Sequence, residues 1–202
     1  MRRLGTLPLE HQPGERWLYD TGADVLGVLI ARAAGQPFDT FLAERIFEPL
    51  GMADSGFAVP ASEFNRFGPC FSTDLDSGNR ELYDPPDGQW SGPPAFPAGG
   101  SGLVSTVDDY LAFAEMLRAG GAYRGQRILS RRSVEAMTTN HLTPEQIATS
   151  SPDPSGTLGW GFGVGVQLRR TGPTRSAGAY GWDGGLGTSW ANDPAADLVG
   201  IL

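Results

Sequence analysis

The chain contains no lysine, because all 15 of its basic residues are arginine. A reaction that needs a lysine amine therefore cannot be completed by these 202 residues alone. Basic clusters are also missing, and 23 acidic residues give a net charge of -8 and a sequence pI near 4.7. An acidic chain of this kind is a poor candidate for binding nucleic acid or an anionic membrane.

Cysteine occurs once, at Cys70, so no internal disulfide is possible. Its aromatic, glycine and proline neighbours favour a buried small apolar residue over a nucleophilic thiol. No apolar run approaches a membrane-spanning length, and residues 1–10 lack the apolar stretch of a signal peptide. The compartment, cytoplasmic or exported, and the oligomeric state both stay open.

Several catalytic patterns are absent as well. There is no Gly-x-Ser-x-Gly elbow and no His-Glu-x-x-His helix. The two histidines, His11 and His141, lie far apart, which favours surface residues over a Ser-His-Asp triad. Without clustered carboxylates they make a poor metal site, so we expect no metal.

Helical patterns dominate about residues 20–150. The first helix is predicted to begin at Asp20 or Thr21 and to end at Gly35, whose lack of a side chain suits a left-handed cap. A second, over 38–47, should be stopped by Pro49. Further helix starts are Thr106 with Asp109 (running to Gly120-Gly121), Ser130, and Thr143 with Pro144.

Two regions differ from this helical pattern. Residues 53–104 are rich in Pro, Gly, Ser and Asp and predict a long loop, which is often functional. Residues 159–168, 180–190 and 198–202 read as three strands, with a turn at Asn192-Asp193-Pro194. The tight connections between these strands predict an antiparallel sheet.

The expected fold class is therefore α/β of the α+β kind: a helical region at about 20–150 and an antiparallel sheet at about 155–202, flanked by helices, in one partial domain over 1–202. The chain ends inside a strand with no polar tail, and it runs almost directly into Pro13-Gly14 and a helix. We therefore expect a truncation at the N-terminus and another at the C-terminus.

A set of landmarks occurs in a fixed order along nearly the whole chain. The set comprises Pro13 to Tyr19, Val25-Leu26-Gly27, Glu44 to Met52, Gly99 to Thr106 followed by Asp109, Gly159 to Gly163, and Gly181 to Thr188 with Asp193-Pro194. This order resembles the serine beta-lactamase-like family, which includes class C beta-lactamases, penicillin-binding proteins and family VIII-type esterases. The run from Glu44 to Met52 is the most specific piece.

The resemblance implies acyl transfer through a serine, with no metal or organic cofactor and with a small-molecule ester or amide as the partner. Such enzymes combine a Ser-x-x-Lys, a Tyr-x-Asn and a strand motif such as Lys-Thr-Gly or Trp-x-Gly. A serine hydroxyl is a weak nucleophile until a neighbour takes its proton, and the tetrahedral oxyanion needs backbone N–H donors.

The second element matches Tyr19, whose implied role is general base, with Thr21 standing where the family often has a substrate-binding Asn. The third matches Trp182-Asp183-Gly184, which would contact substrate, and the N–H of Gly185 would donate to the oxyanion. Taken alone, Tyr19 favours an ordinary half-buried tyrosine at a helix start, and Trp182 favours a core residue beside a glycine-rich bend between two strands. The ordered set of landmarks reverses the interpretation of Tyr19. The Gly99-Gly100-Ser101-Gly102 loop would shape the rim of the cleft.

The first element is missing, since Ser-x-x-Lys requires a lysine. The resemblance places it upstream of Met1. The sequence thus predicts a fragment of a serine hydrolase (an esterase, beta-lactamase or D-Ala-D-Ala carboxypeptidase-like enzyme) that is inactive by itself. The alternative is a non-catalytic binding or interaction module that retains the fold. A missing nucleophile helix also predicts an open sheet edge, a hollow core and poor stability of the isolated chain.

Overall fold

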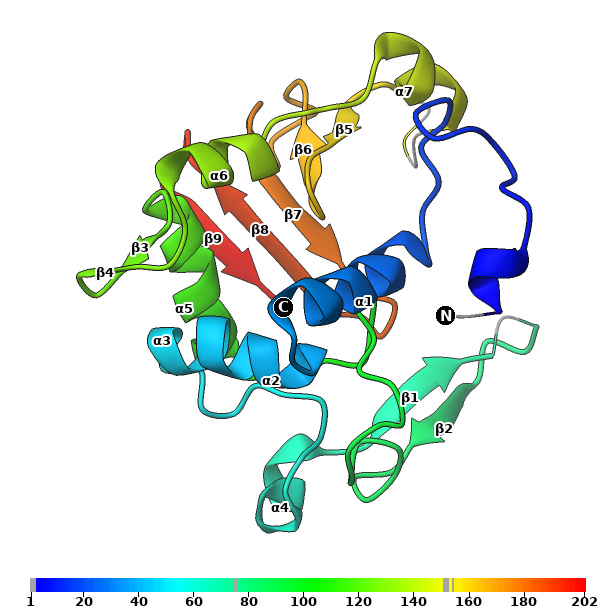
Figure 1. Ribbon diagram of the computed structural model, residues 1–202, viewed down its shortest axis with the longest axis vertical. Helices are drawn as coiled ribbons and strands as arrows, with labels where there is room; N and C mark the ends of the chain where they lie inside the picture. Colours follow the sequence, from blue (N-terminus) through cyan, green and yellow to red (C-terminus); the bar gives the residue numbers. More distant parts are fainter. Residues whose placement is uncertain (1–2, 75, 151–152, 154) are drawn as a thin grey trace.

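A five-stranded antiparallel sheet near the C-terminus organises the computed structural model, which describes residues 3–74, 76–150, 153 and 155–202 (Figure 1). Its strands pair in chain order, so each lies beside the next. They are β5 (Leu158–Trp160), β6 (Gly165–Gln167), β7 (Tyr180–Asp183), β8 (Ser189–Asp193) and β9 (Leu198–Ile201). Together with the helices below, this confirms the predicted class of helices and an antiparallel sheet.

The number of strands differs from the prediction of three. Residues 159–168 split into β5 and β6 because the chain bends at Gly161-Phe162-Gly163, with Gly163 at φ 83°. Residues 180–190 split into β7 and the start of β8 at a turn in which the Gly184 N–H donates to the Thr188 carbonyl (2.7 Å). In both places the glycines were predicted to lie within one continuous strand, but they form a turn between two strands.

The main core lies where α5 packs on β8 and β9. Helix α5 (Val107–Arg118) begins as predicted, with the Thr106 hydroxyl accepting the Asp109 N–H (3.2 Å). Met116 and Leu117 on this helix are almost fully buried. Buried Asn192 on β8 donates to the Ala114 carbonyl (2.8 Å) and to the Tyr180 hydroxyl (3.0 Å), which joins helix and sheet through a satisfied polar group.

Further helices precede and follow α5 along the chain. They are η1 (Leu4–Thr6), α1 (Gly22–Ala34), α2 (Phe38–Leu42), the π-helical η2 (Ala43–Phe47), α3 (Glu48–Leu50), α6 (Arg131–Met137) and α7 (Pro144–Ser150). A small hairpin, β3 (Ala122–Tyr123) with β4 (Gln126–Arg127), follows α5. Within the part of the chain that the structure describes, none of the helices combines the length and apolar character needed to cross a bilayer.

The prediction that Pro49 stops the second helix is wrong. Helical backbone continues through α2, η2 and α3 and ends at Gly51, which has φ 72°. Proline lacks the N–H that would bond four residues back. The π-turn of η2 directly before it changes the hydrogen-bond spacing there, so the helix passes Pro49 without a break.

Residues 53–104 are more ordered than the predicted loop. They hold η3 (Ala61–Glu63), α4 (Phe64–Phe67) and an antiparallel hairpin of β1 (Cys70–Thr73) with β2 (Arg80–Asp84). Cys70, expected to be buried, is half-buried at the start of β1. The hairpin lies apart from the main sheet, beyond α1 (Figure 1).

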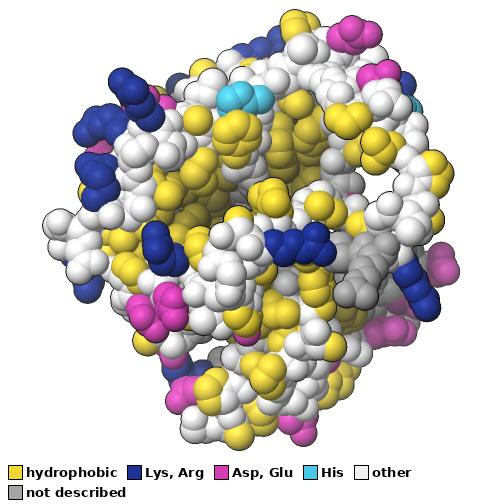
Figure 2. Space-filling view, viewed as in Figure 1, with side chains coloured by type: hydrophobic (Ala, Val, Ile, Leu, Met, Phe, Trp, Pro, Cys, Tyr) yellow, Lys and Arg dark blue, Asp and Glu magenta, His cyan; other side chains and the backbone are white. Residues whose placement is uncertain are grey.

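Helix α1 has the predicted bounds but little cover. Gly35 ends it at φ 67°, as expected for a left-handed cap. Its apolar residues Val25, Leu26 and Leu29 are 46%, 53% and 60% exposed. Above α1, the same face of the molecule is hollowed and lined with hydrophobic side chains over the sheet (Figure 2). An amphipathic helix normally buries such a stripe, so this part of the fold lacks a partner.

Candidate active site

Tyr19 lies on an irregular segment and is held by aromatic side chains. Its ring stacks on Trp17 (centroids 5.6 Å apart) and meets Trp160 and Trp182, each with its centroid 5.7 Å away. The Trp182 Nε1–H donates to the Tyr19 phenol oxygen (2.8 Å). The phenol is thus fixed against β7, although Tyr19 is 58% exposed.

The backbone next to Tyr19 is strained. Asp20 has φ 130°, a region that L-residues other than glycine rarely adopt. Thr21 then stands at the N-cap position of α1 with helical backbone angles, and its side chain makes no capping hydrogen bond. The predicted side-chain cap from Asp20 or Thr21 is therefore not formed. Backbone strain of this kind clusters at functional sites, where it sets the direction of a side chain.

The strand motif lies where β7 ends. The side chain of Asp183 accepts the Ser189 hydroxyl (2.5 Å) and faces Arg175 (3.8 Å), so its carboxylate is occupied by protein groups. A Cβ on Gly184 would lie 2.2 Å from the Thr188 hydroxyl, so a larger residue there would have to displace that side chain. Gly185 follows in open space, with nothing within 4 Å of where its Cβ would be.

The Gly185 N–H is the free donor of this motif. Among the described residues, no hydrogen bond takes it up, whereas the Gly184 N–H is used by the turn. Of the six site residues predicted from the sequence, the structure brings Tyr19 and Trp182 into direct contact. Asp183, Gly184 and Gly185 follow on the same strand end, and Thr21 lies two residues beyond Tyr19 at the start of α1.

The glycine-rich loop predicted to form a rim packs on α1 just after Tyr19. A Cβ on Gly99 would lie 2.1 Å from the Ala23 carbonyl, so only glycine allows this approach. The Gly100 N–H donates to the Asp24 carboxylate (2.9 Å). The loop therefore packs on and fixes the first turn of α1.

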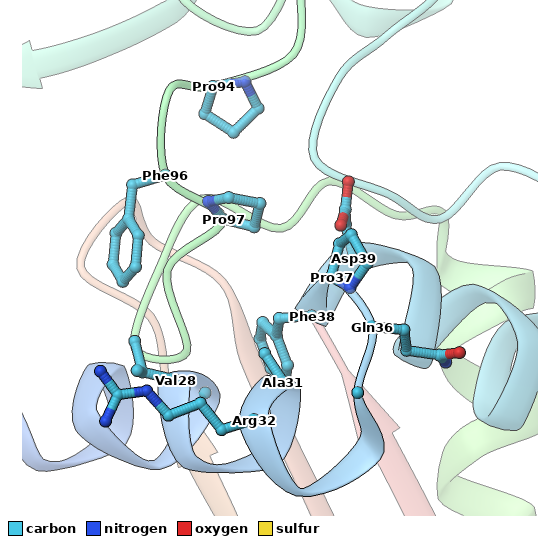
Figure 3. A pocket seen from close by; sticks show the side chains of 12 residues that line it. Val28, Ala31, Arg32, Gln36, Pro37, Phe38, Asp39, Pro94, Phe96 and Pro97 are labelled. Carbon is cyan, nitrogen blue, oxygen red and sulfur yellow. The ribbon is translucent and has the colours of Figure 1, made fainter.

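A separate cavity of about 620 Å³ lies on another side of α1 (Figure 3). Val28, Ala31 and Arg32 of α1 face Phe96 and neighbouring prolines across it. Neither Tyr19 nor the β7 strand lines it.

The sequence pointed to Tyr19 and Trp182 but missed Trp17 and Trp160, which complete the aromatic cluster. Trp160 stands 4.9 Å from Trp17 and 4.5 Å from Trp182, ring centroid to ring centroid. Its only signal was the Gly-Trp-Gly pattern around it. In the described ranges, no three His, Cys, Asp or Glu side chains gather closely enough to hold a metal ion.

Comparison with known proteins gives a consistent family. The model of the Beta-lactamase family matches residues 1–202, which confirms the resemblance seen in the sequence. Protein Rv1367c of Mycobacterium tuberculosis is 39% identical over 97% of this chain and 50% of its own length. Esterase EstB of Burkholderia gladioli is 29% identical over 100% of this chain and 53% of its own length.

A solved structure shows the same fold. A LovD6 mutant of simvastatin synthase from Aspergillus terreus superposes with a TM-score of 0.79 at 25% identity, over 97% of this chain and 51% of that one. The chain therefore spans about half the length of the curated relatives and of the solved structure that it matches.

Proposed function

The chain belongs to the beta-lactamase family, and we propose that it is the C-terminal half of a serine hydrolase that cleaves an ester or amide through an acyl-serine. The observation that carries this proposal is the hydrogen bond from Trp182 Nε1 to the Tyr19 phenol oxygen. It joins two motifs 163 residues apart in the sequence, both expected from the family pattern, at one end of the sheet.

In the proposed mechanism, a serine outside this chain attacks the substrate carbonyl while Tyr19, acting as the phenolate, takes the serine proton and becomes the neutral phenol. The Gly185 N–H donates to the oxyanion that forms, and the tyrosine then returns the proton to the leaving group. Water repeats the sequence to release the acyl group. The indole N–H of Trp182 can donate to the tyrosine oxygen throughout, because it needs only an oxygen lone pair.

We propose an ester in preference to a beta-lactam or a D-Ala-D-Ala peptide. The strand motif is Trp-Asp-Gly and holds no cation, and the Arg175 guanidinium beside it faces the carboxylate of Asp183. A substrate carboxylate would therefore find no free cationic anchor on this strand. The name of the relative esterase EstB agrees with this substrate class.

The serine-bearing half is proposed to pack into the hollow over the sheet. The apolar stripe of Val25, Leu26 and Leu29 faces solvent, and β9 pairs only with β8, which leaves its other edge free among the described strands. An apolar stripe and a free strand edge are features that a folded domain normally covers. Relatives of about twice this length have enough chain to cover both.

The test begins with the gene segment upstream of Met1, where we expect a Ser-x-x-Lys. The 202-residue chain alone should not hydrolyse p-nitrophenyl acetate, and the chain joined to that segment should. In the joined protein, Tyr19→Phe should lower kcat by about 10²–10⁴-fold, the usual contribution of a general base. Tyr83→Phe, at an exposed tyrosine of β2, is the matched control and should keep full activity.

The alternative function is a non-catalytic binding module that retains the fold, and the complete absence of lysine favours it. An upstream segment without Ser-x-x-Lys, or a joined protein that turns over neither p-nitrophenyl acetate nor nitrocefin, would support the module. Turnover that survives Tyr19→Phe would contradict the role proposed for Tyr19.

A further inference from the structure

The segment that carries Tyr19 is held in place by α7. Residues 7–20 form no helix or strand, so their own hydrogen-bond pattern does not fix the phenol. Two bonds from α7 reach this segment: Gln146 Nε2 donates to the Gly14 carbonyl (2.6 Å), and the Ser150 hydroxyl accepts the Trp17 N–H (3.0 Å). The partners lie 132 and 133 residues apart, and the ribbon of the N-terminal segment runs beside α7 (Figure 1).

Both tethering side chains are oriented before they meet the segment. The side-chain oxygen Oε1 of Gln146 accepts the Thr143 N–H (2.9 Å), which directs the side-chain amide nitrogen outward to Gly14. The Ser150 hydroxyl donates to the backbone carbonyl of Gln146 (2.9 Å), which leaves a lone pair on the hydroxyl oxygen to accept the backbone N–H of Trp17. Each group thus uses its donor and its acceptor on separate partners, so its direction is fixed.

The base of α7 is tied to the same aromatic cluster. The Asn140 side-chain oxygen accepts the backbone N–H of Trp160 (3.0 Å), and the backbone N–H of His141 donates to the backbone carbonyl of Trp160 (2.8 Å). The Trp160 ring in turn contacts Trp17 and Tyr19. Two parts of the chain therefore contact the Tyr19 segment: α7 forms hydrogen bonds to it, and the Trp160 indole of β5 packs against its aromatic rings.

We propose that α7 is a positioning element for Tyr19, with Gln146 and Ser150 as its positioning residues. They hold the backbone at Gly14 and Trp17, and so keep the phenol against Trp182. This inference rests on the proposed function for its catalytic meaning, because Tyr19 must act as the base. The tether itself can be measured without any activity.

The first experiment follows the tryptophan indole N–H signals of the ¹⁵N-labelled 202-residue chain by NMR. The Trp182 signal, assigned with Trp182→Phe, reports the bond to Tyr19. Ser150→Ala removes the acceptor of the Trp17 N–H. The Trp182 signal should then move or broaden, and exchange of the Trp17 amide with solvent should accelerate about fivefold, the effect of losing one neutral hydrogen bond.

Thr149→Ala is the matched control, since among the residues that the structure describes the Thr149 hydroxyl bonds only within its own helix, to the Glu145 carbonyl (2.8 Å). It should leave the Trp182 signal unchanged, as should Ser150→Thr, which keeps the hydroxyl. The core indole of Trp190 should not move in any of them. If Ser150→Ala also disturbs Trp190, Gln146→Ala becomes the deciding variant.

Two outcomes separate this inference from the proposed function. If Ser150→Ala frees the Trp17 amide, yet neither Ser150→Ala nor Gln146→Ala changes the Trp182 signal, α7 does not position the phenol, whatever the enzyme does. In the joined, active protein, Ser150→Ala should lower kcat with little change in KM, and Ser150→Thr should restore it. A tether that behaves as expected in a protein without hydrolase activity would contradict the function alone.

Discussion

The core around α5 and the corner around Tyr19 are supported in opposite ways. In the core, helix α5 packs on the sheet, and Met116, Leu117 and Asn192 are almost fully buried between them. At the corner, Tyr19 is more than half exposed, its segment is irregular, and its neighbour Asp20 is strained. Indoles and two hydrogen bonds from α7 hold it there.

This difference shows where the chain can fold by itself and where it needs help. Buried apolar contacts supply most of the stability of a domain, and those contacts lie between α5 and the sheet. The α1 stripe buries little, so the corner contributes little stability until something covers it. Regions of low local stability are also where binding and catalysis are commonly found.

The largest effect should come from replacing one leucine by alanine in each of the two regions and comparing the losses of stability. Leu117→Ala, at a side chain 2% exposed, should lower the free energy of unfolding by about 2–5 kcal/mol. Leu26→Ala, at a side chain 53% exposed on α1, should change it by less than about 0.5 kcal/mol. Urea unfolding followed by tryptophan fluorescence measures both.

The comparison sharpens in the protein joined to its proposed other half. There the α1 stripe becomes an interior surface, so Leu26→Ala should become destabilising while the loss from Leu117→Ala stays the same. Equal effects of Leu26→Ala in both forms would mean that nothing packs on the stripe.

A smaller effect of opposite sign is expected at Asp20. Glycine adopts φ 130° without a Cβ clash, so Asp20→Gly should stabilise the chain by about 1 kcal/mol, the relieved strain less the added freedom of the unfolded chain. Asp87→Gly, at an exposed turn residue with negative φ, is the control and should not stabilise. A loss of stability in Asp20→Gly would show that the backbone there is not strained.

Signals that are local in the sequence predicted the elements well. Gly35 ends α1 and Thr106 caps α5, because a left-handed φ and a capping hydroxyl act within one helical turn. The family pattern also led to the Tyr19 and Trp182 pair. The failures involve competing local geometry: the π-turn at Ala43–Phe47 carries the helix past Pro49, and Gly163 turns a strand into a hairpin.

What the sequence could not predict is contact between distant segments. Nothing near Gly14 or Trp17 indicates that Gln146 and Ser150 bind them, because a capping glutamine and a helical serine have the same local pattern with or without the tether. The exposure of Leu26 was equally hidden, since periodicity shows that a helix has an apolar face and not whether a partner covers it.

The smallest effect should come from acid, at the edge of the core. The Ser176 N–H donates to the Asp193 carboxylate (2.8 Å) and, with smaller contributions from Ala196 and Ala195, holds the pKa of Asp193 below its ordinary value. A depressed pKa stabilises the fold above the unfolded value, near 3.9, and that stability is lost as pH falls through the lower folded value. Asp193→Asn should therefore be less stable than the parent at pH 7 by about 1 kcal/mol, because the amide has one acceptor oxygen where both carboxylate oxygens accept backbone N–H groups. The gap should narrow as the pH falls below about 4. Urea midpoints at pH 7 and pH 3 measure it, and a gap that persists unchanged at pH 3 would show that the charge of Asp193 does not stabilise this turn.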